Sequence, residues 1–228
     1  MLWIPAIKMI RSLPSGLCVG RLEVTLTEVF PAIGADAAAA GFVIAQLGYC
    51  SGAVLWIQDR LAQRETGRPF LTDLTGLGPL ILMQLSRPAD VMIAAEEGLR
   101  CRELAAVIVE VRGDAAALNF TAMRRLALRA EATAVPCWLI RQAATANLSA
   151  ARNRWRVATL PSALNPDDPL APGDPRWRAE LFRSRDRKPG TWVIRHENGT
   201  ADRLNLVAEL PDRTLAKGAG AVGQRSAR

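Results

Sequence analysis

The alternation of buried-strand and helix patterns through residue 140 constrains this chain more than any other feature. Short apolar runs such as Ala53–Ile57 and Leu104–Val111 have strand length, and each is followed by a longer segment with helical spacing. This alternation predicts an α/β fold, with a mostly parallel sheet and helices on both of its faces. The expected strands are residues 22–29, 53–57, 80–85, 104–111 and 136–140, and the expected helices are residues 36–47, 89–100 and 119–133.

The pattern changes after residue 140, where strand-like segments follow one another without helices between them. Strands are expected at residues 153–159, 179–185, 191–197 and 203–207, and Arg187–Gly190 is expected to be a hairpin turn. The sheet should therefore end in an antiparallel C-terminal extension. The expected organisation is an N-terminal segment (1–20), a core (21–160), a basic Arg/Trp-containing β extension (161–210) and a disordered tail (211–228).

The formal charge is distributed unevenly along the chain. Residues 1–140 hold 13 basic and 13 acidic side chains, whereas residues 141–228 hold 16 and 9, so the whole net charge of +7 lies in the last part. Such an excess predicts an anionic partner, of which nucleic acid is the commonest. A solvated arginine-rich surface that only keeps the protein soluble is the alternative.

Composition excludes several classes of protein. The chain is 50% hydrophobic, too apolar for a disordered protein, and it lacks an uninterrupted apolar run of membrane-spanning length. The N-terminus lacks a positive region and an Ala-x-Ala site, so no signal peptide is predicted and no membrane contact is expected. The four widely spaced cysteines predict buried free thiols in the cytoplasm, where association with the nucleoid stays open. The single His196 argues against a histidine metal site or a Ser-His-Asp triad, so no metal is predicted.

The loop between the first expected strand and helix lacks the chemistry of a phosphate-binding loop. A working loop needs glycines, a lysine and a hydroxyl, in the pattern G-x-x-x-x-G-K-[S/T]. Here Gly34 and Gly41 frame an alanine-rich stretch in which Asp36 adds negative charge. This degenerate loop predicts no ATPase activity, no cofactor and no catalytic residue.

Glu110 lies near the end of the expected strand 104–111, where nucleotide hydrolases carry an acid linked to magnesium. Gln58 and Asp59, at the end of another strand, could mimic residues that orient an attacking water. Without a phosphate cradle these groups have no substrate, so Glu110 is interpreted as a remnant acid at a strand end that faces water. A nucleotide enzyme with an unusual site built on Gly34, Asp36 and Glu110 is the competing hypothesis.

Two Arg-Trp-Arg triplets stand out in the basic part. Arginine pairs with phosphate and an aromatic ring stacks on a base, so the triplets and the loop from Arg141 to Arg152 are candidates for contact with nucleic acid or a protein partner. On a strand, tryptophan and arginine point to opposite faces, so the alternative places tryptophan in the core and the arginines at the surface. The candidates are Arg141, Arg152, Arg154, Trp155, Arg156, Arg176, Trp177 and Arg178.

A set of soft motifs, in order and over residues 20–207, carries a resemblance to a known family. The motifs are Glu28–Pro31, Gly34–Phe42, Val54–Ile57, Ala94–Cys101, Leu104–Val111, Arg124–Leu126, Ala150–Val157, Pro161-Ser162, Pro175–Glu180 and Lys188–Ile194. Together they resemble the RecA-like fold and, more closely, the ImuA proteins of bacterial mutagenesis cassettes.

The resemblance implies a non-catalytic role in SOS-induced, error-prone translesion DNA synthesis. The implied partners are an ImuB-like relative of Y-family polymerases and an error-prone DNA polymerase III α subunit, with RecA and weakly bound DNA as further options. ATP-dependent strand exchange is not implied, because the phosphate loop is degenerate. A different class, the SulA-type inhibitor of cell division, also resembles RecA without a phosphate loop and stays open as the alternative.

Overall fold

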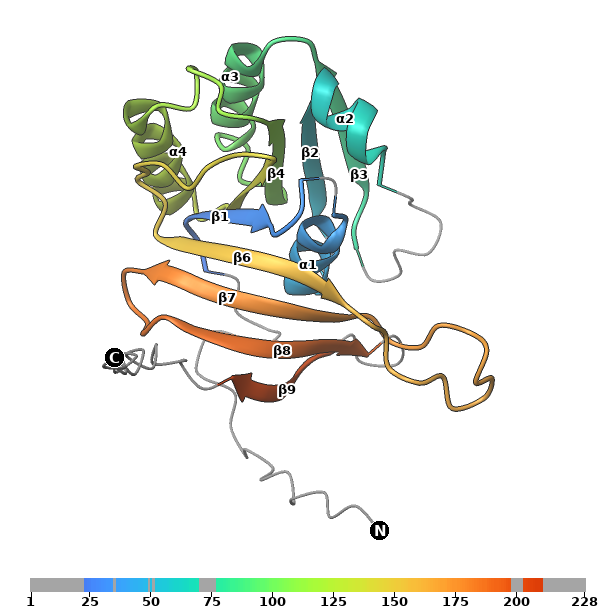
Figure 1. Cartoon of the computed structure of the whole chain (residues 1–228). Coiled ribbons are helices and arrows are strands. Elements are labelled where there is room, and N and C mark those ends of the chain that lie inside the picture. The colour runs from blue at the N-terminus through green and yellow to red at the C-terminus, as the bar shows by residue number, and fades with distance from the viewer. Residues whose placement is uncertain are drawn as a thin grey trace, which may run out of the picture.

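The computed structural model describes residues 23–34, 36–48, 50, 52–69, 77–197 and 203–210, with only the backbone for residues 197 and 203–210. The expected N-terminal segment 1–20 and tail 211–228 lie outside these residues. The described strands form one sheet in the order β3-β2-β4-β5-β1-β6-β7-β8-β9 (Figure 1). The strands are β1 (Leu26–Pro31), β2 (Ala53–Asp59), β3 (Leu80–Leu85), β4 (Leu104–Arg112), β5 (Cys137–Gln142), β6 (Asn153–Leu160), β7 (Arg176–Ser184), β8 (Gly190–Glu197) and β9 (Arg203–Leu210).

The sheet has a parallel part and an antiparallel part, as the sequence predicts. In the order of the sheet, the strands β3, β2, β4, β5, β1 and β6 pair in parallel, and β6, β7, β8 and β9 then pair as antiparallel neighbours. The expected hairpin between β7 and β8 is present, with residues 185–189 as its connection, since Gly190 already belongs to β8. Residues 161–175 connect β6 to β7 as a loop that extends away from the body of the molecule (Figure 1). This arrangement is RecA-like.

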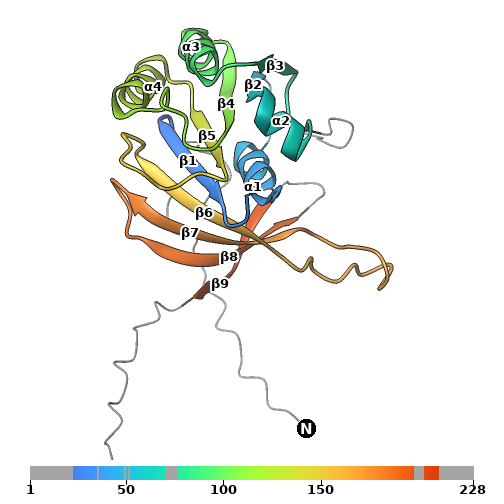
Figure 2. The same ribbon diagram turned by 45° about the horizontal axis from the view of Figure 1, so that its top comes forward.

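Helices cover both faces of the parallel part because its strands are apolar on both sides (Figure 2). Trp56 and Ile108 point into the cluster under α1, whereas Leu55 and Val107 point into the cluster under α3 and α4. The expected cap of α4 is confirmed, since Asn119 accepts a hydrogen bond from the backbone N–H of Ala122 at 3.0 Å. The helices are α1 (Ala38–Leu47), α2 (Arg60–Thr66), α3 (Pro88–Gly98) and α4 (Phe120–Thr133).

The structure corrects several expectations. The first strand runs over Leu26–Pro31 rather than residues 22–29, and it is buried on both faces because it lies between β5 and β6. Cys137 is buried, which raises the pKa of its thiol to about 12, but Cys101 lies exposed in a turn, so the expectation of buried thiols is wrong there. None of the described helices is both long and apolar enough to cross a bilayer.

Candidate functional site

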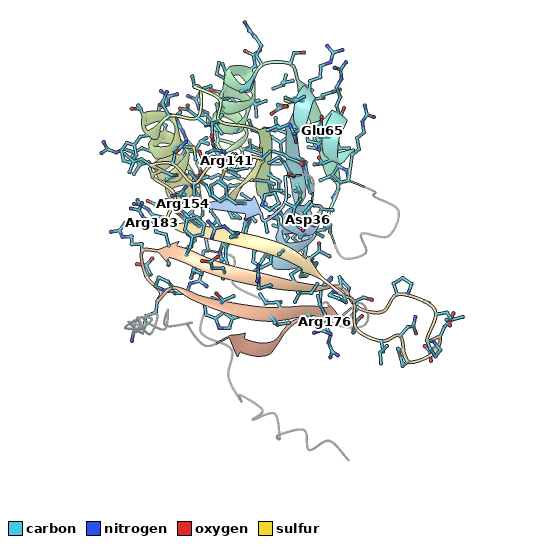
Figure 3. The ribbon with its side chains drawn as sticks, in the orientation of Figure 1. Asp36, Glu65, Arg141, Arg154, Arg176 and Arg183 are labelled. Carbon is cyan, nitrogen blue, oxygen red and sulfur yellow. The ribbon has the colours of Figure 1, made fainter. Side chains whose placement is uncertain are left out.

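The loop after β1 is held shut by Asp36 rather than open for phosphate. The Asp36 carboxylate accepts hydrogen bonds from the backbone N–H of Ala38 at 2.8 Å and from the hydroxyl and N–H of Thr159 on β6, at 2.5 and 3.0 Å. Figure 3 shows Asp36 at this junction of α1 and β6. A donor at the start of α1 that could meet an anion is therefore engaged by the chain's own carboxylate.

The two glycines of the degenerate loop have packing roles. A Cβ on Gly34 would come within 3.0 Å of the Cβ of Ala143, so glycine allows the loop to lie against the end of β5. Gly41 lies inside α1, not in the loop, and a Cβ there would come within 3.1 Å of the Trp177 ring. Gly41 thus lets α1 approach β7 closely.

Replacing Asp36 with alanine should destabilise the protein by about 1 kcal/mol at neutral pH, the usual cost of losing a side-chain cap. Burial would raise the pKa of Asp36, but the hydrogen bonds from Thr159 and Ala38 outweigh it and hold the pKa below the ordinary 3.8. Because the folded pKa is lowered, this stabilisation is complete above pH 3.8 and is lost as the pH falls through the folded value. Urea unfolding across this range measures it, with Asp167→Ala, at an exposed loop carboxylate, as the control. Equal losses in both variants would contradict the role given to Asp36.

Glu110 does not face water, as the sequence interpretation expected, but is 2% exposed. Its Oε2 accepts from Trp56 Nε1 at 3.3 Å and Gln58 Nε2 at 2.8 Å. Its Oε1 accepts from Thr66 Oγ1 at 2.8 Å and Gln142 Nε2 at 3.0 Å. Both oxygens are occupied by uncharged donors, so the carboxylate joins the ends of β2, β4, β5 and α2 and leaves no free side toward a ligand.

Asp59 likewise has a structural use. Its Oδ1 accepts from the backbone N–H groups of Leu61 and Ala62, both at 2.7 Å, and so caps α2. Its Oδ2 accepts from the N–H of Arg112 at 2.7 Å and ties α2 to the end of β4. Gln58, Asp59 and Glu110 are therefore brought together at the carboxyl ends of β2 and β4, as their positions at strand ends suggest. All three side chains are hydrogen-bonded to neighbouring elements of the fold.

A buried ion cluster crosses β5, β1 and β6. Glu28, fully buried on β1, accepts from Arg141 on β5 at 3.3 Å and from Arg154 on β6 at 2.6 Å. Arg141 also pairs with Asp114 at 2.9 Å, so two cations meet two carboxylates. The hydrogen bond from Thr145 is the main cause that lowers the pKa of Asp114, and the charge of Arg141 lowers it further. Burial raises this pKa, but by less. Arg141 and Arg154, close together in Figure 3, are therefore committed inside the protein.

The tryptophans of the two triplets are core residues. Trp155 is 3% exposed and lies between Phe42 and Trp192, with ring centroids 5.4 and 5.9 Å away, and Trp177, 6% exposed, is also buried in the same cluster as α1. The alternative interpretation of the triplets is confirmed for both tryptophans. It is wrong for Arg154, which lies inside the ion cluster instead of at the surface.

The remaining candidate arginines are Arg152, directly before β6, and three that alternate with core residues on one face of β6 and β7, namely Arg156, Arg176 and Arg178. Arg152 is paired with Glu131 at 2.7 Å, and Arg156 with Glu180 at 2.9 Å. Arg176 is half-buried near one end of β7, and Arg178 is exposed on the same strand. Groups of three or more histidine, cysteine or acidic side chains that could hold a metal are absent among the described residues.

Sequence reasoning missed the arginines and the aromatic ring that do gather at the surface. A groove lies between α4, the end of the β5–β6 connection and the end of β7. We call it the arginine groove; its lining is Phe120, Arg124, Ala127, Leu128, Ser149, Ala150, Ala151, Arg152, Arg183, Ser184 and Arg185. Of its four arginines only Arg152 was among the candidates, and the candidate loop from Arg141 to Arg152 also supplies Ser149, Ala150 and Ala151. No local signal could identify the others, because they come from three segments that only the fold brings together.

Comparison with known proteins gives a family. No protein-family model matches the chain. The proteins called Protein ImuA from two strains of Caulobacter vibrioides are 33% identical to it over 181 residues, a stretch that covers 72% of this chain and 70% of each relative. The resemblance inferred from the soft motifs is thereby confirmed, and the chain belongs to the ImuA family.

Proposed function

We propose that this protein is a non-catalytic accessory protein of an ImuA–ImuB mutagenesis cassette, acting in SOS-induced, error-prone translesion DNA synthesis. Membership of the ImuA family supports the process. The loop at Asp36 and the enclosed Glu110 support the absence of ATP hydrolysis, since the loop has no lysine for a phosphate and the carboxylate at the end of β4 is buried. Such a protein acts by binding others.

The open edge of the sheet at β3 is the observation that carries a docking role. Within the described part of the chain, no strand pairs with the outer side of β3. The strand is apolar yet uncovered, with Ile81, Leu82 and Met83 about 40–50% exposed. Natural edge strands normally carry charge, proline or a cover, so an edge like this one favours a protein partner.

The backbone of β3 is oriented to accept another strand. The N–H of Val54 on β2 donates to the carbonyl of Pro79 at 2.8 Å, which turns that carbonyl toward β2. Backbone groups of successive residues alternate in direction, so those of Leu80 and Leu82 point to the open side. The helices that contact β3 each add an exposed apolar side chain, Leu61 on α2 and Ile93 on α3. We infer that an extended apolar segment of the ImuB-like polymerase relative pairs with β3.

Replacing Leu82 with lysine should weaken capture of the ImuB-like protein roughly tenfold or more, since a charge would be placed at the centre of the paired edge. The matched control is Leu170→Lys, which adds the same charge at a fully exposed leucine of the β6–β7 loop. Pull-down of purified full-length proteins measures both, and added magnesium-ATP should change neither.

Capture from SOS-induced cells then tests the process. The error-prone DNA polymerase III α subunit should be recovered together with the ImuB-like protein. Recovery of the tubulin-like division protein in their place would overturn the proposed function in favour of a SulA-type role. Equal capture by the Leu82 and Leu170 variants would overturn only the assignment of the docking site to β3 and would leave the proposed process standing.

A further inference from the structure

The arginine groove has a size and lining suited to a flexible anionic chain. It encloses about 460 Å³ and is lined by four arginines, with no carboxylate among the lining residues. Arg124 comes from α4, Arg152 from the start of β6, and Arg183 and Arg185 from the end of β7. Figure 3 shows Arg183 at the left end of β7, on the same side of the molecule as α4, and Arg176 at the right end of the strand.

Most of this positive charge is unused within the described structure. The side chains of Arg124 and Arg183 make no hydrogen bond or ion pair with a described residue, and both are exposed. Arg152 donates to both carboxylate oxygens of Glu131, at 2.7 and 3.1 Å. Glu131 also lies within the electrostatic influence of Arg185. Glu131 and Asp186 lie beside the groove, so four cations face two nearby carboxylates and an excess of positive charge remains for a ligand.

An aromatic ring lies in the same groove. Phe120, the first residue of α4, is 45% exposed. Leu128, about two turns further along the helix, is also exposed. The ring contacts of the described residues do not include Phe120, so no other aromatic ring of that part of the chain stacks on it. An exposed phenyl ring beside unpaired guanidinium groups can stack on a base while the arginines bind phosphates.

We propose that the arginine groove binds single-stranded nucleic acid, with phosphates on Arg124 and Arg183 and an unpaired base against Phe120. A duplex keeps its bases stacked inside and offers no face to the ring. Acidic peptides also bind arginine clusters, but such a peptide is a weaker fit here, because it does not use the exposed ring of Phe120 and cannot add a strand to β7, which is already paired on both sides. This inference rests on the proposed function, since it places the DNA of that process on this chain.

Binding of a fluorescent 20-nucleotide oligo-dT to the full chain, followed by anisotropy at several salt concentrations, tests the proposal. The double variant Arg124→Ala with Arg183→Ala should bind at least tenfold more weakly. The slope of log affinity against log salt should fall by about 1.4, or about 0.7 for each lost phosphate contact. The control Arg64→Ala with Arg102→Ala removes the same charge at exposed arginines outside the groove, and it should change affinity less than twofold.

Phe120→Ala separates stacking from charge. We expect affinity to fall about tenfold with the salt slope unchanged, because stacking releases no counterions. The substituted side chains are exposed, so thermal unfolding should match the parent. Equal losses in the groove and control variants, or no binding by the parent, would overturn the proposal. So would tighter binding of a 20-residue poly-glutamate peptide.

The test also separates this inference from the proposed function. The docking edge is β3, at one end of the sheet. The groove lies beside β7, which is separated from β3 by the five other strands of the parallel part. Loss of oligonucleotide binding with intact capture of the ImuB-like protein supports both assignments. Absence of oligonucleotide binding by the parent, with capture still dependent on Leu82, would overturn only the nucleic-acid site.

Discussion

Replacing Glu28 with alanine is expected to lower the free energy of unfolding by about 3–5 kcal/mol, as breaking a buried ion pair from one side does. Glu28 is fully buried and accepts from Arg141 and Arg154, which are themselves only 5% and 4% exposed. Without it, Asp114 remains as the one carboxylate partner, and Arg154 is left as an uncompensated charge in the core. Urea unfolding of the full chain measures the loss.

The control for this prediction is Glu180→Ala, which breaks the pair with Arg156 on the exposed face of β6 and β7. Both of those side chains are about 40% exposed, so the cost should stay below about 1 kcal/mol. Replacing Glu28, Arg141 and Arg154 together with methionine should recover much of the stability lost by Glu28→Ala, since no buried charge then lacks a partner. A similar cost for Glu28→Ala and Glu180→Ala would show that water reaches the cluster.

The sequence predicted most of the architecture because local patterns encode it. The apolar run Leu104–Val111 has the length and composition of a buried strand, and Asn119 before an amphipathic segment is a helix-capping signal. The antiparallel end followed from strand-like runs joined by a short turn. The first strand was misplaced because the alternation at residues 22–29 resembles a half-exposed strand, whereas its polar residues Thr27 and Glu28 are buried in the centre of the sheet.

The candidate site was harder to predict because a strand's depth in the sheet is a tertiary property. Glu110 at a strand end looked solvated, but α2 and the neighbouring strands close over it and supply four donors. Arg141 and Arg154 looked available for phosphate, but Glu28 holds both from β1, the strand between β5 and β6. A charged residue inside an otherwise apolar parallel strand was the usable signal for this cluster, since such a charge needs a partner nearby.

Replacing Trp155 with alanine should cost about 3–5 kcal/mol, because a large buried ring would be removed from between Phe42 and Trp192. The residue looked like a base-stacking ring in sequence, and its burial at 3% exposure now predicts that it acts only on stability. Trp155→Phe keeps an aromatic ring in the core, so it should fold, and its affinity for oligo-dT should equal that of the parent. Urea unfolding and anisotropy on the same preparations give both quantities.

Phe120→Ala should give the opposite pattern, since its ring is nearly half exposed: stability within about 0.5 kcal/mol of the parent, and weaker oligonucleotide binding. The two aromatic residues thus separate folding from recognition. If Trp155→Phe lost oligonucleotide affinity while Phe120→Ala kept it, the β6–β7 face would have to open in solution, and the triplets, whose Arg156 and Arg178 are exposed, would regain a role in binding. If the expected pattern holds, nucleic acid meets this fold at α4 and the end of β7, and the triplets serve the core.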